Sequence, residues 1–400
     1  MRFAWPFAVA LLPVILTAQQ PVSRADAVTA ALARGARIAL GRADTLAALG
    51  AARAARALPN PTISASYTKD TPNYHALADL PLDVPWLRSP RIGAAEASRE
   101  AARHQFAYER AGIVFDVDTS YTRTLAAAMH ARLSRRTADD ADSLLKIAQV
   151  RRDVGDVSEL DVRLAAVNAG QLENTALDDS LAALATLLSL QLQIGLRGDS
   201  PAIVLVDSLV TLDDSSAGPP SQSGEYLPIA TATARLRSAE RTLSFTRASR
   251  FAPSVEFGFD TGDPGSANPN ATLPVIGFSL PFPLFNRSGG EVTRAIAARD
   301  RAGAELELAR RETNAGVARA RRELVAARER ARRSADLVAS ANRVAAMSLQ
   351  AYGEGAVPLA NVLEAQRNAR EILARYIDDL AAADAALRLL RWLTATSGQP

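Results

Sequence analysis

Four short stretches of the chain alternate between apolar residues and small or polar ones, and they constrain the fold more than any other feature. A period of two is the pattern of a β-strand with one apolar face. Each stretch has about nine residues, the length that a tilted transmembrane strand needs. Four such strands cannot close a barrel, and open sheet edges are not tolerated in lipid, so several copies would have to share one barrel. The stretches lie near residues 62–68, 78–87, 254–260 and 273–282.

Prolines in these stretches favour a competing interpretation. Pro81, Pro85, Pro274 and Pro281 lack the N–H that a ladder hydrogen bond requires, so they would have to lie at strand ends or bulges. An ordinary four-stranded sheet in a periplasmic protein therefore stays open as the alternative.

Long stretches without proline predict very long helices. Pro283 and Pro358 are separated by 74 residues, and Pro90 and Pro201 by 110. At 1.5 Å per residue, the shorter stretch would reach about 110 Å if it were fully helical. Its apolar residues keep a helical spacing with Arg and Glu between them, which indicates one buried face and one solvated face. The many alanines favour a sheath of closely packed helices rather than a thick core.

The chain repeats this order of strands and helices once. Pro61 and Pro253 mark corresponding breaks, and Gly155 and Gly355 interrupt the two long helical regions 200 residues apart. Turns at these glycines would let each helix reverse direction. The sequence thus predicts a first repeat over 22–200 turning at 155, a linker or equatorial segment over 201–224, and a second repeat over 225–398 turning at 355.

The N-terminus is typical of a secretory signal peptide. One basic residue, Arg2, precedes an apolar run from Phe3 to Leu16, which is too short for a spanning helix. Residues 1–18 are the predicted signal peptide, and an uncleaved interfacial anchor is the alternative. We therefore expect an exported protein.

Composition excludes several classes of site. The chain has no cysteine, which excludes disulfides, thiolate metal sites and a thioether lipid anchor. Of its 46 basic residues only Lys69 and Lys146 are lysine, and the arginines alternate with acidic residues along helical stretches. That pattern indicates a solvated helix face rather than the basic patch of a nucleic-acid protein.

No complete motif for catalysis or for a cofactor is present, since Ser143-Leu144-Leu145-Lys146 matches Ser-x-x-Lys without the accompanying Lys-Thr-Gly. Walker loops, dinucleotide-binding glycines, His-Glu-x-x-His and Gly-x-Ser-x-Gly are all missing from the sequence. The three histidines, His75, His104 and His130, have no metal-ligand spacing. We therefore expect no enzyme activity, no catalytic residue, no cofactor and no metal site.

The residues around Gly355 resemble the signature of the TolC-like outer-membrane efflux proteins. Segment 352–359 reads YGEGAVPL and segment 362–366 reads VLEAQ. A further segment, 277–290, reads GFSLPFPLFNRSGG and is similar to the branch that serves cobalt–zinc–cadmium (heavy-metal) efflux systems. The resemblance covers nearly the whole chain after residue 18.

The resemblance implies an α+β membrane protein that acts as a homotrimer. Each chain would contribute four transmembrane strands to one 12-stranded β-barrel in the outer-membrane lipid of a Gram-negative-type bacterium. Its helices would form a long α-helical barrel, a coiled-coil tunnel in the periplasm. Such proteins are the exit ducts of tripartite pumps. The implied partners are a periplasmic adaptor (membrane fusion) protein and an inner-membrane pump of the RND type, and the cargo would be small solutes such as metal cations or drugs.

The resemblance also assigns residues of a gate at the tunnel entrance. Asp161 and Tyr352 match gate residues that relatives link to an arginine, yet Val357 occupies the position of that arginine. Asn361 falls where relatives carry an aspartate of the entrance ring, and Glu364 falls on a second acidic ring position. Three glutamates in a narrow mouth would select for cations. Ordinary helix-surface charge is the alternative for Asp161 and Glu364.

The same resemblance places the adaptor contact at the two helical turns. The residues implied are Val154, Gly155, Val157, Gly355 and Val357. Two other functions stay open at this point. One is a duct for type I protein secretion, and the other, from a different class, is a periplasmic coiled-coil adaptor or scaffold.

Overall fold

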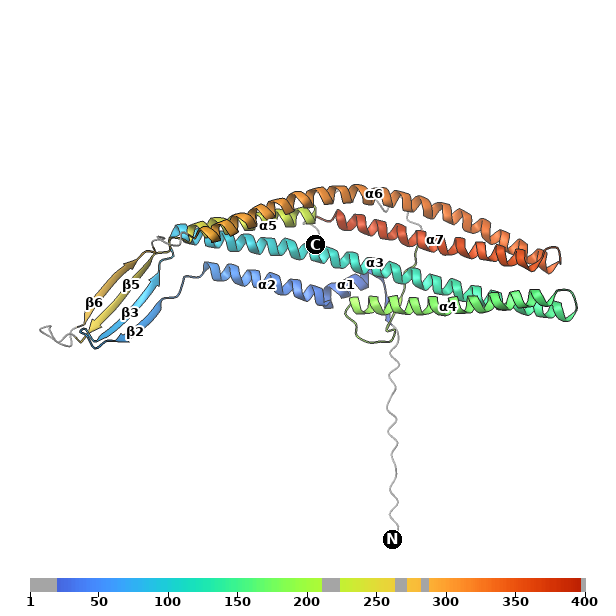
Figure 1. The fold of residues 1–400 in the computed structure, drawn as a ribbon, viewed down its shortest axis with the longest axis horizontal. Coiled ribbons are helices and arrows are strands. Elements are labelled where there is room, and N and C mark those ends of the chain that lie inside the picture. The colour runs from blue at the N-terminus through green and yellow to red at the C-terminus, as the bar shows by residue number, and fades with distance from the viewer. Residues whose placement is uncertain (1–19, 211–223, 263–271, 282–287, 397–400) are drawn as a thin grey trace, which may run out of the picture. The chain divides into compact units, whose positions relative to one another are not determined.

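The computed structural model describes residues 20–210, 224–262, 272–281 and 288–396 (Figure 1). The predicted signal peptide and most of the predicted linker lie outside these residues. The elements in chain order are β1 (Gln20–Val22), α1 (Arg24–Arg34), α2 (Ala36–Arg56), β2 (Thr62–Tyr67), β3 (Tyr74–Pro81), α3 (Pro85–Asp153), α4 (Glu159–Gln193), β4 (Ile203–Leu205), α5 (Leu227–Ala248), β5 (Ser254–Thr261), β6 (Leu273–Ser279), α6 (Gly289–Gly353) and α7 (Leu359–Leu393).

The chain forms two compact units, and each draws on both halves of the sequence. The first unit comprises Met1–Gly35, Val114–Ser216 and Leu324–Arg388. The second comprises Ala36–Ile113, Ala217–Glu323 and Leu389–Pro400. The units do not coincide with the two sequence repeats, because each of the helices α3 and α6 contributes to both units.

The long helices of the first unit are related by an offset of 200 residues. Helices α3 and α6 end at Asp153 and Gly353, and α4 and α7 each have 35 residues with bounds 200 apart. Partly buried polar contacts follow the same offset. The hydroxyl of Ser134 on α3 donates to Asp179 on α4, and the hydroxyl of Ser334 on α6 donates to Asp379 on α7. Each long helix therefore pairs with its short partner through the same kind of contact (Figure 1).

Helix α4 has two apolar seams with coiled-coil spacing, and only one of them is covered within the chain. The covered seam, in steps of three and four residues, includes Val162, Ala165, Leu172, Ala176 and Leu190, all buried. A second seam begins five residues later, which places it about 140° around the helix. This open seam of α4 consists of Val167, Gly170, Asn174, Leu177, Leu181, Leu184 and Leu188.

The leucines of the open seam are largely exposed. Leu181 is 65% exposed and Leu177 is 54% exposed. Exposed leucines at helical spacing indicate a face that packs against another helix. In the first unit of a single chain, no described element covers this face.

The second unit contains an antiparallel four-stranded sheet with the order β2-β3-β5-β6 (Figure 1). Strand β2 pairs with β3 from Thr62↔Asp79 to Tyr67↔Tyr74, and β3 pairs with β5 along its whole length. Strand β6 pairs with β5 from Ser254↔Ser279 to Asp260↔Leu273. Strands β2 and β6 are consequently the two edges of the sheet.

This register puts apolar side chains on one face of the sheet across all four strands. One row runs Ile63, Ala78, Phe257 and Ile276. The other face carries every charged residue of the sheet. The apolar face consists of Ile63, Ala65, Tyr67, Tyr74, Ala76, Ala78, Leu80, Val255, Phe257, Phe259, Pro274, Ile276 and Phe278. The charged residues of the opposite face are His75, Asp79, Glu256 and Asp260. Ile276 and Phe278 are 77% and 67% exposed, so this apolar face is not covered within the chain.

The second strand differs from the sequence prediction of 78–87. Strand β3 begins at Tyr74 and ends at Pro81, and Pro85 begins helix α3. Proline disrupts a ladder but is tolerated in the first turn of a helix, where an N–H has no partner to lose. The true start of β3 was missed because Ala76 and Ala78 are small residues on its apolar face, while Leu77 lies on the polar face.

The other strands lie close to their predicted positions. Strand β2 ends one residue before the predicted 68, and β5 extends one residue beyond the predicted 260. Strand β6 ends at Ser279, and residue 282 of the predicted stretch lies outside the described residues. Among the helices that the structure describes, none is long and apolar enough to cross a membrane.

Candidate functional site

Both helical hairpins of the first unit reverse through turns of the same geometry. At the end of α3, Gly155 has φ +80, and the N–H groups of Gly155 and Asp156 donate to the carbonyls of Arg152 and Arg151. At the end of α6, Gly355 has φ +73, and the N–H groups of residues 355 and 356 donate to the carbonyls of residues 352 and 351. This is the Schellman arrangement, whose left-handed residue favours glycine.

The ends of all four helices meet in one apolar cluster next to these turns. It contains Leu144 and Ala148 of α3, Val162 and Ala165 of α4, Tyr352 of α6, and Leu359 and Val362 of α7. Val357 packs against the cluster as a partly buried residue. An apolar residue at 357 is thus part of the packing, at a position where the sequence resemblance implies an arginine.

A different arginine contacts Tyr352. The guanidinium of Arg151, in the last turn of α3, lies over the Tyr352 ring with 4.6 Å between Cζ and the ring centroid. Its Nη1 donates to the backbone carbonyl of Tyr352 at 2.6 Å, and its Nε donates to the carboxylate of Asp156 at 2.6 Å. The hydrogen bond to Asp156 raises the pKa of Arg151. Arg151 was not among the residues implied by the sequence resemblance.

The two gate residues implied by the resemblance are not hydrogen-bonded to each other. The Asp161 carboxylate accepts from the hydroxyl of Ser158 at 2.8 Å and from its N–H at 3.2 Å, which completes a capping box at the start of α4. The Tyr352 side chain is 3% exposed, and its hydroxyl has no hydrogen-bond partner among the described residues. Burial raises the pKa of Tyr352 and is the largest effect. The positive charge of Arg151 lowers this pKa, and the negative charge of Asp161 raises it.

The two residues of α7 that the resemblance places at the entrance lie on its exposed surface. Asn361 is exposed, and its N–H donates to the carbonyl of Pro358. The Glu364 carboxylate accepts from Arg367 at 2.9 Å and from the amide of Asn368 at 3.3 Å. Within one chain Glu364 is therefore a paired surface charge, with a cation three residues away.

The residues predicted to meet an adaptor lie at the two turns. Val154 is 75% exposed, and a side chain added at Gly155 would meet no atom within 4 Å. Val157 and Val357 are partly buried. The exposed part of this set is therefore the α3–α4 turn together with Gly355.

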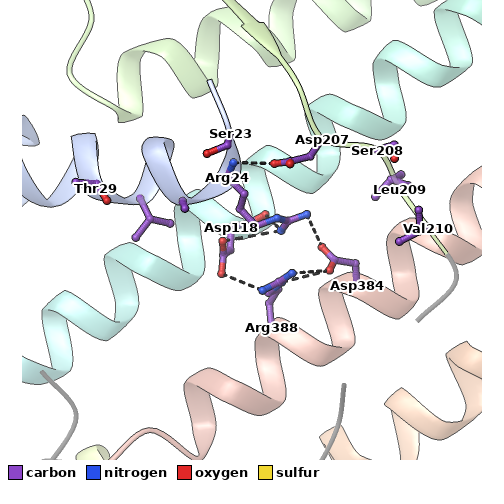
Figure 2. A pocket seen from close by; sticks show the side chains of 12 residues that line it. Ser23, Arg24, Thr29, Asp118, Asp207, Ser208, Leu209, Val210, Asp384 and Arg388 are labelled. Carbon is purple, nitrogen blue, oxygen red and sulfur yellow. Dashed lines mark hydrogen bonds and ion pairs between the residues drawn. The ribbon is translucent and has the colours of Figure 1, made fainter. Parts of the chain in front are cut away.

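A second charged site, absent from the sequence prediction, lies where α1, α3 and α7 meet (Figure 2). Arg24 and Arg388 alternate with Asp118 and Asp384 in a ring of ion pairs, which we call the four-charge ring. The shortest contacts join Asp384 to Arg388 at 2.9 Å and to Arg24 at 3.0 Å. No sequence spacing indicates this ring, since its members come from three distant segments. It lines a cavity of about 680 Å³, but its charges satisfy one another and leave none for a ligand.

The four-charge ring controls the ionisation of Asp384. Burial alone would raise the pKa of Asp384, but the hydrogen bond from Thr122 and the charges of Arg24 and Arg388 outweigh it and hold the pKa below its usual value. A carboxyl with a lowered pKa stabilises the fold above its unfolded pKa and loses that contribution as pH falls through the folded pKa. The neighbouring Tyr121 has its pKa raised to about 12, mainly by burial.

We expect Asp384→Asn to lower the free energy of unfolding by about 3 kcal/mol at neutral pH, because it leaves two arginines facing one carboxylate in a buried ring. The difference from the wild type should shrink as the pH falls below the usual aspartate range and through the lowered pKa of Asp384, where Asp384 itself becomes protonated. Thermal unfolding in detergent followed by circular dichroism measures this. Asp378→Asn is the matched control on α7, since Asp378 is 68% exposed and pairs with His130 at the surface. Equal losses in both variants would contradict a special role for the ring.

Within the residues that the structure describes, no group of three His, Asp or Glu side chains is placed to hold a metal ion. The histidines pair with single carboxylates instead, as His75 does with Asp260 at 2.8 Å.

Comparison with known proteins gives a consistent result. Residues 227–396 match the family model described as Outer membrane efflux protein. The chain is 27% identical over 255 residues to the cobalt-zinc-cadmium resistance protein CzcC of Cupriavidus metallidurans, and this match covers 62% of the chain and 60% of CzcC. The chain thus matches less than two thirds of that relative's length.

Solved structures resemble the fold over nearly the whole chain. CusC has a TM-score of 0.75 at 15% identity, with 94% of this chain and 92% of CusC covered. The outer membrane protein VceC of Vibrio cholerae has a TM-score of 0.74 at 16% identity, with 93% and 96% covered. The matched proteins are described as efflux, channel-forming or outer membrane proteins, in agreement with the expectation that the chain is not an enzyme. The family match over residues 227–396 and the shared fold make the chain similar to outer-membrane efflux proteins, as the residues around Gly355 predict.

Proposed function

We propose that the chain is the outer-membrane exit duct of a tripartite efflux system, a passive homotrimeric channel gated at its helical tips. It would export small solutes such as metal cations or drugs, driven by an inner-membrane pump of the RND type through a periplasmic adaptor. CzcC is named as a cobalt-zinc-cadmium resistance protein, which favours metal cations as the cargo class.

The exposed apolar face of the sheet is the observation that carries this proposal. Its outward residues include Ile63 at 80%, Ile276 at 77% and Phe278 at 67% exposure, and the opposite face is charged. One lipid-compatible face and one polar face are what the wall of a transmembrane barrel requires. Its edge strands β2 and β6 need partners in lipid, because unpaired backbone groups there cost several kcal/mol each. Three copies with four strands each would supply a closed 12-stranded barrel.

The open seam of α4 supports the same assembly in the helical part. Helix α6 also has exposed apolar residues at seam spacing, with Leu337, Val344 and Met347 between 54% and 69% exposed. Helix α4 has five acidic residues and one basic, whereas α6 has thirteen basic and eight acidic. Opposite charge favours contact of α4 in one copy with α6 of the next, a head-to-tail interface that can close into a ring. The 200-residue offset between α4 and α7 supports two structural repeats in the tunnel wall.

The proposal is tested by extracting the protein from isolated outer membranes in mild detergent and measuring its mass and its conductance in planar bilayers. A mass of three chains with discrete conductance steps is the expected result. A soluble monomer without conductance would contradict the duct and favour a periplasmic scaffold. Conductance that depends on a co-expressed protein substrate would favour a secretion duct.

The entrance charge gives a further prediction. We expect Glu364→Gln to lower the cation preference of the reconstituted channel and Arg367→Gln to raise it, because the two side chains are paired at 2.9 Å and carry opposite charges. Reversal potentials in a salt gradient measure the preference. If neither variant shifts the reversal potential, Glu364 is not at the entrance.

A further inference from the structure

Arg151 lies at the C-terminal ends of two long helices at once. It belongs to the last turn of α3, where a cation interacts favourably with the partial negative charge of the helix end. Its Nη1 also donates to the carbonyl of Tyr352, one of the last carbonyls of α6. That oxygen already accepts from the N–H of Gly355 at 2.9 Å, so the guanidinium occupies its second lone pair.

Helix α6 has no cation of its own at this end. Its last turn contains no basic residue, whereas the last turn of α3 contains Arg151 and Arg152. At the 200-residue offset, Ala351 is the counterpart of Arg151. The C-terminus of α6 therefore relies on an arginine from the neighbouring hairpin. The α3–α4 hairpin supplies this cation, and the last turn of α6 supplies none in return.

The contacts of Arg151 bridge the two hairpins, while those of its neighbour do not. Arg151 bonds Asp156 in the α3–α4 turn and Tyr352 at the end of α6, and its side chain is only 16% exposed. Arg152 pairs with Asp153 and Glu159, both in its own hairpin. Separation of the α6–α7 tip from the α3–α4 tip would break every bond of Arg151 to Tyr352 and none of those of Arg152.

We propose that Arg151 is the latch of the closed tip, a positioning residue that holds the α6–α7 hairpin against the α3–α4 hairpin. It does this from the last turn of α3. The latch rests on the proposed function, because it matters only if the tips separate when the duct opens. Opening then requires loss of a charge-assisted hydrogen bond and of the cation–π contact with Tyr352, together with loosening of the apolar cluster that the two hairpins share.

The test is the single-channel behaviour of the purified full-length protein in planar bilayers. We expect Arg151→Ala to raise the open probability about tenfold, the effect of one lost hydrogen bond to a charged group. Arg151→Lys should give an intermediate value, since a lysine retains the charge but not the planar fork that bonds both partners. Arg152→Ala is the matched control and should record like the wild type.

A second variant tests the latch from its other side. Asp156→Asn leaves Arg151 in place but weakens its anchor, and we expect a smaller rise, about threefold, in the open probability. Asp156 is an exposed turn residue, so this variant does not disturb the core even if Arg151→Ala folds poorly. The mass in detergent should match that of the wild type for all variants.

The outcomes separate the latch from the duct. Pores whose open probability is the same in the wild type, Arg151→Ala and Asp156→Asn would overturn the latch and leave the duct intact. An equal rise of the open probability in Arg152→Ala would also overturn the latch, because the effect would then come from the loss of any positive charge at the tip. A wild-type protein that forms no pore would overturn the duct and the latch together.

Discussion

Leu181→Glu is expected to abolish the homotrimer. Leu181 lies in the open seam of α4 and is 65% exposed in a single chain. In the proposed assembly its side chain would be buried against α6 of a second copy, where a leucine contributes about 2 kcal/mol. A glutamate would bring an unpaired charge into that contact, at a cost of several kcal/mol in each of three interfaces. We therefore expect monomers, measured as mass in mild detergent after extraction from the outer membrane.

Ala182→Glu provides the control for this assembly test. Ala182 is the next residue on α4 and is also exposed, but it lies outside both seams. The charge introduced is the same, so a normal trimer is expected. A trimer in Leu181→Glu, or monomers in both variants, would contradict the open seam of α4 as an interface.

Ala65→Arg is expected to prevent insertion into the outer membrane. Ala65 lies in the middle of β2 on the apolar face, in the row with Ala76, Phe259 and Pro274. An arginine at mid-depth on the lipid face of a barrel costs about 2–4 kcal/mol, and the change would occur three times in one trimer. Fractionation of the cells should show the variant depleted from the outer membrane and degraded or retained in the periplasm.

Ser64→Arg separates the two faces of the same strand. Ser64 is the preceding residue of β2 and lies on the polar face, opposite Leu77. An arginine there would point into the barrel interior, so we expect normal insertion and an altered conductance. Equal depletion of both variants would show that the apolar face does not contact lipid, and would favour an ordinary periplasmic sheet.

The local periodicities of the sequence predicted the long helices and three of the four strands of the large sheet. The alternation in 254–260 and the long stretches without proline correspond to β5 and to the helices α3 and α6. The glycines at 155 and 355 are turn residues with positive φ. These features depend on neighbours within a few residues, which is why a single sequence reveals them. Strand β3 was misplaced because alanines on its apolar face conceal the alternation.

The candidate gate was only partly accessible from the sequence. Resemblance singled out Tyr352, which is buried among the four helix ends. It also implied Asp161, whose carboxylate caps α4 instead of bonding Tyr352. Arg151 was missed, although a basic last turn beside Gly155 and an alanine at the corresponding position 351 are visible in the sequence. Neither of these two features indicates that the guanidinium of Arg151 reaches the α6–α7 hairpin.

The sequence by itself determined where the long helices and most strands of the large sheet lie, where the helices reverse, and which family the chain resembles, because these follow from local patterns and short motifs. The tertiary structure alone decided which partner each charged or apolar group has. Arg151 and Tyr352 are 201 residues apart, and Thr122 and Asp384 are 262 apart, yet each pair is in contact. A contact of that kind depends on how distant helices pack and on their relative rotation. No local spacing encodes either of these, so the latch and the four-charge ring became visible only in three dimensions.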